Sequence, residues 1–326
     1  MLSKFYKVLA MCLCGLLMIA FVGCGNTTDE DEGEEKPSEK TESVFVDPNF
    51  ETGFDIYGTG INGADRELQK SIKFGEEEPN WKIAQWYSQH FLDKGEVTLN
   101  DNLFSISDTS KSVVLDRNTG AITLSMNAGE EFESVQTSVG SFWPHLLLEQ
   151  NIEPVKFSEC ETMEAHLSFQ INRALDRASD FGEDKANLQA QFAWFVYVQN
   201  VNPDSAGLGE FLWFGFNLFD PTKLYAQQVS QQDFAGGNPG NYIYAMGAAD
   251  CIGTERVKVG QKSEMTVDMF EAVQVGLDAA HAAGFMSNTT LQDCAITGMN
   301  IGFEIFDVWD LSVTLYDMGV TYTPKE

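Results

Sequence analysis

Positive charge is scarce in this sequence, which has 20 Lys and Arg residues against 49 Asp and Glu, a formal net charge of −29. Binding to nucleic acid depends on cationic side chains that neutralise phosphates, so we expect no nucleic-acid partner. A strongly anionic polysaccharide is repelled for the same reason, unless a local patch or calcium reverses the field. Neutral glycans fit this charge better.

Cysteine is too sparse for a disulfide-rich protein. Of the six cysteines, two lie in an N-terminal apolar run and a third stands two residues after it. The remainder can form at most one internal disulfide, and their spacing is unlike that of a zinc site. They are Cys160, Cys251 and Cys294. We therefore expect no metal centre, and a structural calcium ion is the one cofactor left open.

The apolar run Val8 to Val22 is too short for a comfortable membrane span, which needs roughly 20 apolar residues. Two lysines precede it, as in the charged start of a signal peptide. The run ends in Phe21-Val22-Gly23-Cys24, which resembles the lipobox of bacterial lipoproteins. The resemblance implies cleavage before Cys24, lipidation of that cysteine, and a protein held at the outer face of a bacterial membrane or cell surface. An uncleaved anchor or an ordinary signal peptide is the alternative.

The segment Asn26 to Glu42 has eight acidic residues, two lysines and no large apolar side chain. Such a segment cannot bury enough surface to offset its ordering entropy, so it is predicted to be a disordered spacer. Its run Asp29 to Glu32 is better explained as solvated charge than as a calcium site. The predicted organisation is a signal peptide over residues 1–23, a lipidated tether over 24–45 and a single domain over 46–326.

Short alternating runs separated by Asn, Asp and Gly fill residues 96–137. They predict strands over residues 97–99, 103–106, 113–115 and 122–126. Strands of this length at near ten-residue spacing are typical of an antiparallel β-sandwich.

Longer strands follow, and each alternates between an apolar and a polar face. They are predicted over residues 163–173, 188–199, 211–219 and 300–305. Because successive side chains of a strand point to opposite sides, one face of each is core. We expect the four strands to share one polar, partly aromatic face.

One helix is predicted, from Asp268 to Ala283. Phe270, Val273 and Leu277 lie on one stripe of it. Asp268 is placed to cap its start, and Gly284 stands where a helix usually stops. The predicted fold class is therefore all-β, an antiparallel β-sandwich with one or two peripheral helices.

The polar face suggests a sugar-binding surface. Gln and Asn can both donate to and accept from sugar hydroxyls, and aromatic rings offer flat apolar area to a pyranose. The predicted ligand-binding residues are Gln170, Gln191, Tyr197, Trp213 and Asn217. A sheet with one plainly solvated side is the alternative.

An enzyme on this scaffold would need two facing carboxylates, or a Tyr and His pair for β-elimination. The candidate catalytic residues are Glu164, His166 and Glu304, with Tyr197 as the phenol. The separation of Glu164 from Glu304 in space would decide whether they can act together.

Three further segments carry weaker signals. The Gly58 to Gly63 motif matches a dinucleotide-binding fingerprint, but no βαβ unit follows it. The stretch after Trp143 places Trp143, His145 and Glu149 on one side of a strand, where packing at the edge of the core is the favoured explanation. The glycine-containing stretch 231–242 is expected to be a connecting loop, with a mobile rim over a groove as the alternative.

The long apolar strands with a polar face resemble the concanavalin A-like jelly rolls, over residues 96–322. Many carbohydrate-binding modules and several glycan-cleaving enzymes share that architecture. The Glu-x-Asp-x-x-Glu signature of the laminarinase-like hydrolases is absent. The prediction is thus a surface lipoprotein that binds a neutral carbohydrate. A glycan-cleaving hydrolase or lyase is the second hypothesis, and a structural or interaction lipoprotein is the third.

Overall fold

The computed structural model describes residues 40–58, 67–140, 143–233, 241–253 and 256–326. The predicted signal peptide and residues 24–39 of the predicted tether, Cys24 included, lie outside these residues, as does most of the Gly58 to Gly63 motif. Within the described residues no helix is long and apolar enough to cross a membrane.

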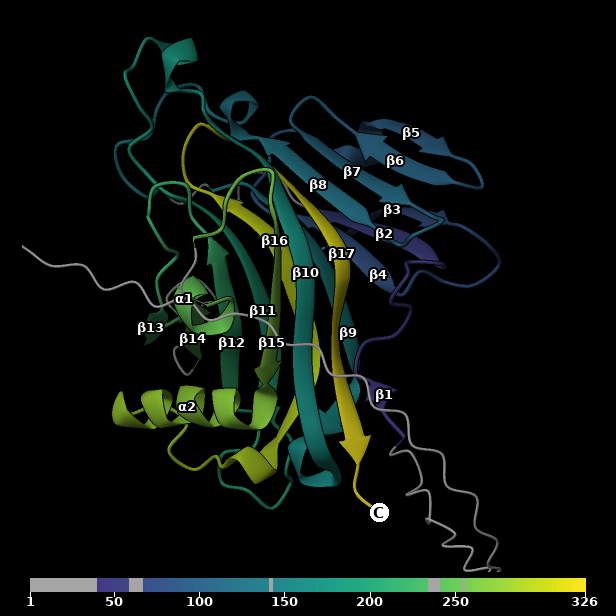
Figure 1. Cartoon of the computed structure of the whole chain (residues 1–326), viewed down its shortest axis with the longest axis vertical. Helices are drawn as coiled ribbons and strands as arrows, with labels where there is room; N and C mark the ends of the chain where they lie inside the picture. Colours follow the sequence, from purple (N-terminus) through teal and green to yellow (C-terminus); the bar gives the residue numbers. More distant parts are fainter. Residues whose placement is uncertain (1–39, 59–66, 141–142, 234–240, 254–255) are drawn as a thin grey trace, which may run out of the picture. The chain divides into compact units, whose positions relative to one another are not determined.

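Two β-sheets make up about half of the described chain (Figure 1). The nine-stranded sheet has the order β13 (Val229–Gln232), β14 (Tyr242–Gly247), β12 (Phe211–Phe219), β11 (Ala190–Asn200), β16 (Cys294–Ile305), β9 (His145–Lys156), β4 (Trp81–Gln85), β2 (Gly53–Gly58) and β3 (Glu67–Lys73).

The eight-stranded sheet has the order β15 (Lys262–Asp268), β10 (Cys160–Asp176), β17 (Trp309–Pro324), β8 (Ile122–Asn127), β7 (Lys111–Asp116), β6 (Leu103–Ser107) and β5 (Glu96–Leu99). The short β1 (Glu42–Ser43) pairs with β17 off this path. All the strands predicted from alternation are present, and the predicted all-β sandwich is confirmed.

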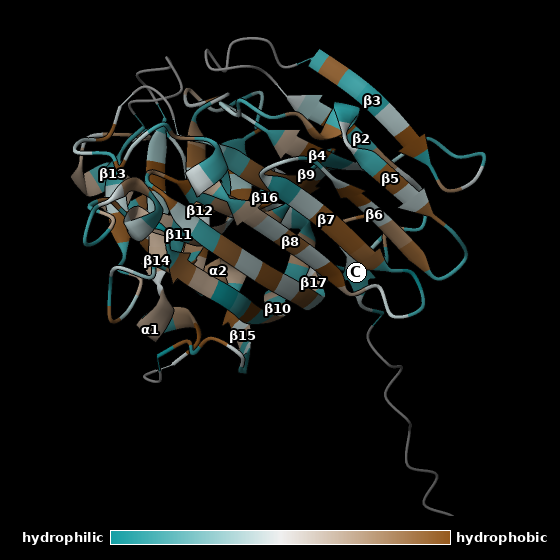
Figure 2. Ribbon diagram, turned by 90° about the horizontal axis from the view of Figure 1, so that it is seen from above, coloured by the Kyte–Doolittle hydropathy of each residue, from teal (hydrophilic) through white to brown (hydrophobic). Residues whose placement is uncertain are grey.

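Apolar side chains from both sheets form one core between them. On β11 the alternate residues Phe192, Trp194 and Val196 are fully buried. Phe192 contacts Phe169 of β10, with ring centroids 5.3 Å apart, so the two sheets meet through aromatic side chains. Alternating hydrophobic and hydrophilic bands along the strands are visible in Figure 2. Because successive side chains of a strand point to opposite faces, the outer face of each sheet differs in composition from the face that lines the core.

Strand direction departs from the prediction at two places. β14 runs parallel to β12, and β4 runs parallel to β2, whereas the other pairs are antiparallel. Parallel neighbours need a crossover connection, and alternation along one strand carries no information on the direction of its partner.

The predicted helix is confirmed as α2 (Met269–Ala282). The Asp268 side chain accepts hydrogen bonds from the backbone N–H of Phe270 at 2.8 Å and of Glu271 at 3.2 Å. Gly284 adopts φ +86° after its end, a conformation that glycine reaches without strain. Gly276 lets the helix approach Leu212 of β12, so α2 packs on one end of the sheet. A shorter helix, α1 (Ala248–Cys251), lies beside β12 and β14.

Residues 42–45, which the sequence analysis assigned to the tether, belong to the folded domain. Glu42 and Ser43 form β1, and Val44 and Phe45 are each only 3% exposed. Burial of these two apolar side chains anchors the segment that directly precedes residue 46. The folded body therefore includes the last residues assigned to the tether from charge alone.

Cys160, Cys251 and Cys294 are buried free thiols and form no disulfide. Burial raises the pKa of the Cys160 thiol to about 11, and that of Cys251 and of Cys294 to about 12. Among the described residues there is no cluster of His, Cys, Asp and Glu that could hold a metal ion.

Candidate functional site

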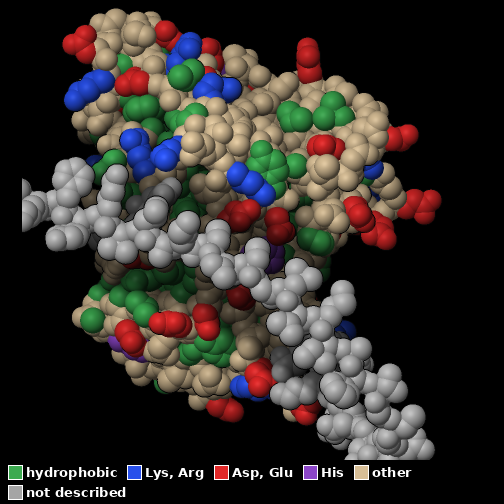
Figure 3. Space-filling view, in the orientation of Figure 1, with side chains coloured by type: hydrophobic (Ala, Val, Ile, Leu, Met, Phe, Trp, Pro, Cys, Tyr) green, Lys and Arg blue, Asp and Glu red, His purple; other side chains and the backbone are tan. Residues whose placement is uncertain are grey.

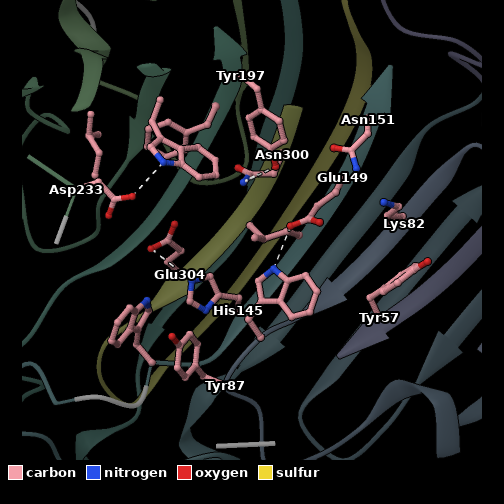
Figure 4. A pocket seen from close by; sticks show the side chains of 16 residues that line it. Tyr57, Lys82, Tyr87, His145, Glu149, Asn151, Tyr197, Asp233, Asn300 and Glu304 are labelled. Carbon is pink, nitrogen blue, oxygen red and sulfur yellow. Dashed lines mark hydrogen bonds and ion pairs between the residues drawn. The ribbon is translucent and has the colours of Figure 1, made fainter. Parts of the chain in front are cut away.

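A cleft of about 370 Å³ lies on the outer face of the nine-stranded sheet (Figure 4). That volume falls within the usual range of ligand sites. Most of its lining comes from the alternate positions of β14, β12, β11, β16, β9, β4 and β2 that point away from the core. The lining residues are Tyr57, Lys82, Trp86, Tyr87, Trp143, His145, Leu147, Glu149, Asn151, Phe195, Tyr197, Trp213, Asp233, Ile243, Asn300 and Glu304.

Two glycines make room for aromatic rings on this face. Tyr197 of β11 stands opposite Gly298 of β16, and Phe195 stands opposite Gly215 of β12. A Cβ atom at position 298 would lie 2.8 Å from the Tyr197 ring, and one at position 215 would lie 2.5 Å from the Phe195 ring. The rings can therefore pack against bare backbone of the neighbouring strand.

One side of the cleft is an aromatic cluster that we call the Trp213 wall, comprising Phe195, Tyr197, Phe211 and Trp213. The Trp213 ring stands edge to face with Tyr197, at a centroid distance of 4.9 Å and an angle of 82°. Its Nε1 donates a hydrogen bond to Asp233 Oδ2 at 3.1 Å. These contacts fix the ring in one orientation beside the cleft.

The other side is the Trp143 wall, comprising Tyr87, Trp143, His145 and Phe306. Trp143 stacks on Tyr87 at a centroid distance of 4.8 Å and on Phe306 at 5.9 Å. His145 lies 5.7 Å from the Tyr87 ring. Tyr87 has φ +59°, a left-handed conformation that is uncommon for a bulky residue and is often found at functional sites.

Carboxylates and amides lie between the two walls (Figure 4). Glu149 Oε1 accepts a hydrogen bond from Trp86 Nε1 at 3.0 Å. Glu304 Oε2 lies 3.6 Å from His145 Nε2. Asn300 Nδ2 donates to the Tyr197 hydroxyl at 3.2 Å. The floor of the cleft thus presents acceptors and donors in fixed positions, as recognition of hydroxyl groups requires.

The structure brings together part of the predicted site. Tyr197, Trp213 and Glu304 all line the cleft. Gln191 stands opposite Glu304 in the register of β11 and β16, but it is not among the lining residues. Asn217 is buried, and its Nδ2 donates to the Gln227 carbonyl at 2.9 Å, so it serves the local fold.

Trp143, His145 and Glu149 also line the cleft, although packing at the edge of the core was the favoured prediction for them. His145 is only 7% exposed, so that prediction describes its burial but not its position beside Glu304. Of the stretch 231–242, Asp233 reaches the cleft, and residues 234–240 lie outside the described part of the chain.

The expectation that four strands share one polar face is wrong for β10. Glu164, His166 and Gln170 lie on β10 in the eight-stranded sheet, whereas Glu304 lies on β16 in the other. Glu164 and Glu304 therefore cannot form a facing pair of carboxylates, and His166 cannot act with Tyr197. Polar alternation marks the outer side of any sandwich sheet, and it does not tell which of the two sheets a strand joins.

Tyr57, Lys82, Trp86 and Tyr87 are lining residues that the sequence analysis missed. Trp86 and Tyr87 follow β4 in a connecting segment, where no periodicity marks orientation. Lys82 stands between the buried residues Trp81 and Ile83 on β4, so the alternation of this short strand could have placed Lys82 on the outer face.

The chain matches no protein-family model and no curated protein. Its fold is similar to those of glycoside hydrolase family 12 structures. A metagenome-derived family 12 endoglucanase is 12% identical, with a TM-score of 0.35, over 69% of this chain and 92% of that one. A family 12 xyloglucanase from Bacillus licheniformis is 12% identical, with a TM-score of 0.38, over 70% and 96%.

The xyloglucanase domain of NopAA, a type three effector from Sinorhizobium fredii solved with cellobiose, is 9% identical, with a TM-score of 0.35, over 70% of this chain and 96% of that one. The chemistry of a site depends on its own residues and not on the fold that carries them.

Proposed function

We propose that the protein binds a neutral carbohydrate chain in the cleft between the Trp213 wall and the Trp143 wall. The observation that carries the proposal is the arrangement of aromatic rings on both sides of a floor of carboxylates and amides. Rings present flat apolar area to the C–H faces of sugars, while the floor can meet their hydroxyl groups.

The charge of the cleft favours an uncharged ligand. Glu149, Asp233 and Glu304 line it, whereas Lys82 is its only Lys or Arg among the described residues. Acidic side chains are also spread over the face of the molecule in Figure 3. An anionic polymer would meet like charge both on approach and at the site.

We further propose that Cys24 carries a lipid that holds the protein at the outer face of a bacterial membrane. The apolar run that ends in Gly23-Cys24 supports this location. Mass spectrometry of membrane-extracted protein should detect a diacylglyceryl group that Cys24→Ala abolishes. An unmodified chain that retains residue 1 would contradict it.

Hydrolysis of the bound glycan is the second candidate, because the cleft contains carboxylates. Glu149 is opposite Asn300, and Glu304 is opposite His145, so the two glutamates are offset by four positions on adjacent strands. At the usual rise per strand residue their Cα atoms are roughly 14 Å apart. Glycosidases hold their two carboxyl groups about 5 to 9.5 Å apart. Because each glutamate carboxyl extends several ångströms from its Cα, the two carboxyl groups can lie much closer together than the Cα atoms, and hydrolysis by this pair stays the second candidate.

Release of reducing ends from a panel of neutral glycans separates the two candidates. We expect none from the wild-type protein. Turnover that Glu149→Gln or Glu304→Gln abolishes, with affinity unchanged, would establish the hydrolase instead.

A glycan array tests binding itself. The domain that starts at Lys40 should bind a neutral glycan on the array, and its double variant Trp143→Ala/Trp213→Ala should not bind it. Tyr316→Ala is the matched control, because Tyr316 is 40% exposed on β17 of the other sheet. Equal loss in both variants would contradict a role for the cleft.

A further inference from the structure

A fully buried ion pair lies next to the segment that carries Trp86 and Tyr87. Lys111 Nζ of β7 is 2.7 Å from Glu131 Oε1, and both side chains are inaccessible to solvent. Asp108 Oδ2 lies 3.1 Å from the same Nζ, and the Ser110 hydroxyl donates a hydrogen bond to Glu131. We call Asp108, Ser110, Lys111 and Glu131 the buried cluster.

The buried cluster holds the backbone that follows Tyr87. Glu131 Oε2 accepts a hydrogen bond from the Gln89 backbone N–H at 2.5 Å. The Gln89 side-chain amide donates to the Glu131 carbonyl, also at 2.5 Å. Lys111 Nζ donates to the His90 carbonyl at 2.8 Å. Three hydrogen bonds therefore fix this segment two and three residues after Tyr87.

Tyr87 needs such support, because a left-handed backbone is strained for a residue with a side chain. It has φ +59° and stacks on Trp143, while the carbonyl of Trp86 accepts a hydrogen bond from the His145 backbone at 2.9 Å. The segment thereby supplies part of the Trp143 wall and the indole that binds Glu149.

A gain in folding stability does not by itself explain why the buried cluster is charged. Burying an ion pair often stabilises a protein no more than well-packed apolar residues of the same size would. Here the pair connects β7, in the eight-stranded sheet, to a segment at the edge of the cleft on the nine-stranded sheet. Its hydrogen bonds end on the segment that presents Trp86 and Tyr87.

We propose that Lys111 and Glu131 are positioning residues for the glycan cleft, which act by fixing the conformation of Trp86 and Tyr87. This inference rests on the proposed glycan binding, but its structural part can be tested without any glycan. Neither residue lines the cleft, so their effect on binding must pass through the segment.

The test uses ¹⁹F NMR of protein labelled with 5-fluorotryptophan, which has six tryptophans to report on separate sites. Trp→Phe substitutions assign the resonances of Trp86, Trp143 and Trp213. Glu131→Gln should shift or broaden the Trp86 and Trp143 resonances and leave that of Trp213 unchanged. Affinity for the neutral glycan that binds best on the array should fall roughly 2- to 30-fold.

Two milder variants cover the case in which Glu131→Gln does not fold. Glu131→Asp keeps the charge but shortens its reach to the Gln89 N–H, and Gln89→Ala removes only the side-chain amide. Both should move the same two resonances. The matched control is Asp310→Asn, since Asp310 is 8% exposed and lies 2.6 Å from Arg173, within the eight-stranded sheet.

Unchanged Trp86 and Trp143 resonances in the folded variants would overturn the inference, as would equal shifts in Asp310→Asn. If these resonances move but wild-type protein binds no glycan, the positioning of the segment stands and the proposed function fails. The two failures are therefore distinguishable.

Discussion

Trp213 is the side chain whose removal should most clearly weaken glycan binding. Its ring is half-buried and is oriented by Tyr197 and by its hydrogen bond to Asp233. By analogy with aromatic pairs, we expect Trp213→Ala to weaken binding by about 0.5 to 1.5 kcal/mol. Calorimetric titration measures the change, and thermal unfolding checks that the variant is folded. An unchanged affinity would remove the Trp213 wall from the site.

The three buried cysteines should react slowly with thiol reagents. Because burial raises the pKa values of Cys160, Cys251 and Cys294 to between about 11 and 12, each is a protonated thiol near neutral pH. The thiolate is the reactive form, so labelling by iodoacetamide should be slow in the folded domain and fast after denaturation. Rapid labelling of any one of them in native protein would show that its site opens.

At the scale of elements, β1 and the two residues after it should be needed for full stability. A domain that starts at Lys40 retains β1, Val44 and Phe45, whereas one that starts at residue 46 loses them. Two buried apolar side chains stabilise a fold by about 3 kcal/mol or more. Urea denaturation should show a loss of that order only in the shorter domain. Equal stability of the two would mean that the segment contributes nothing by docking.

Element positions were the best predicted feature of this protein, since strand alternation and the cap of α2 are local signals. The pairing of strands was not predictable in the same way. β10 and β11 have similar alternation of apolar and polar residues, yet they belong to different sheets. The structure therefore brings together only some of the predicted site residues. Tyr197, Trp213 and Glu304 converge, whereas Glu164 and His166 do not. Tyr87 had no sequence signal, because its left-handed backbone is held by tertiary hydrogen bonds.

At the scale of the whole molecule, the charge of −29 makes a salt titration informative. Electrostatic attraction or repulsion of a charged ligand is screened as ionic strength rises, whereas contacts to a neutral sugar are not. The affinity for the bound glycan should therefore change little between low salt and about 0.5 M NaCl. Binding that strengthens steeply with salt would indicate an anionic ligand.

The crystal structure of the domain with the neutral glycan that binds best on the array tests the central claim most directly. We expect sugar rings in the cleft of the nine-stranded sheet, against Trp213 on one side and the Trp143 wall on the other, with hydroxyl groups near Glu149, Asn300 and Glu304. Sugar bound instead over β10 on the eight-stranded sheet, with the cleft empty, would contradict the account.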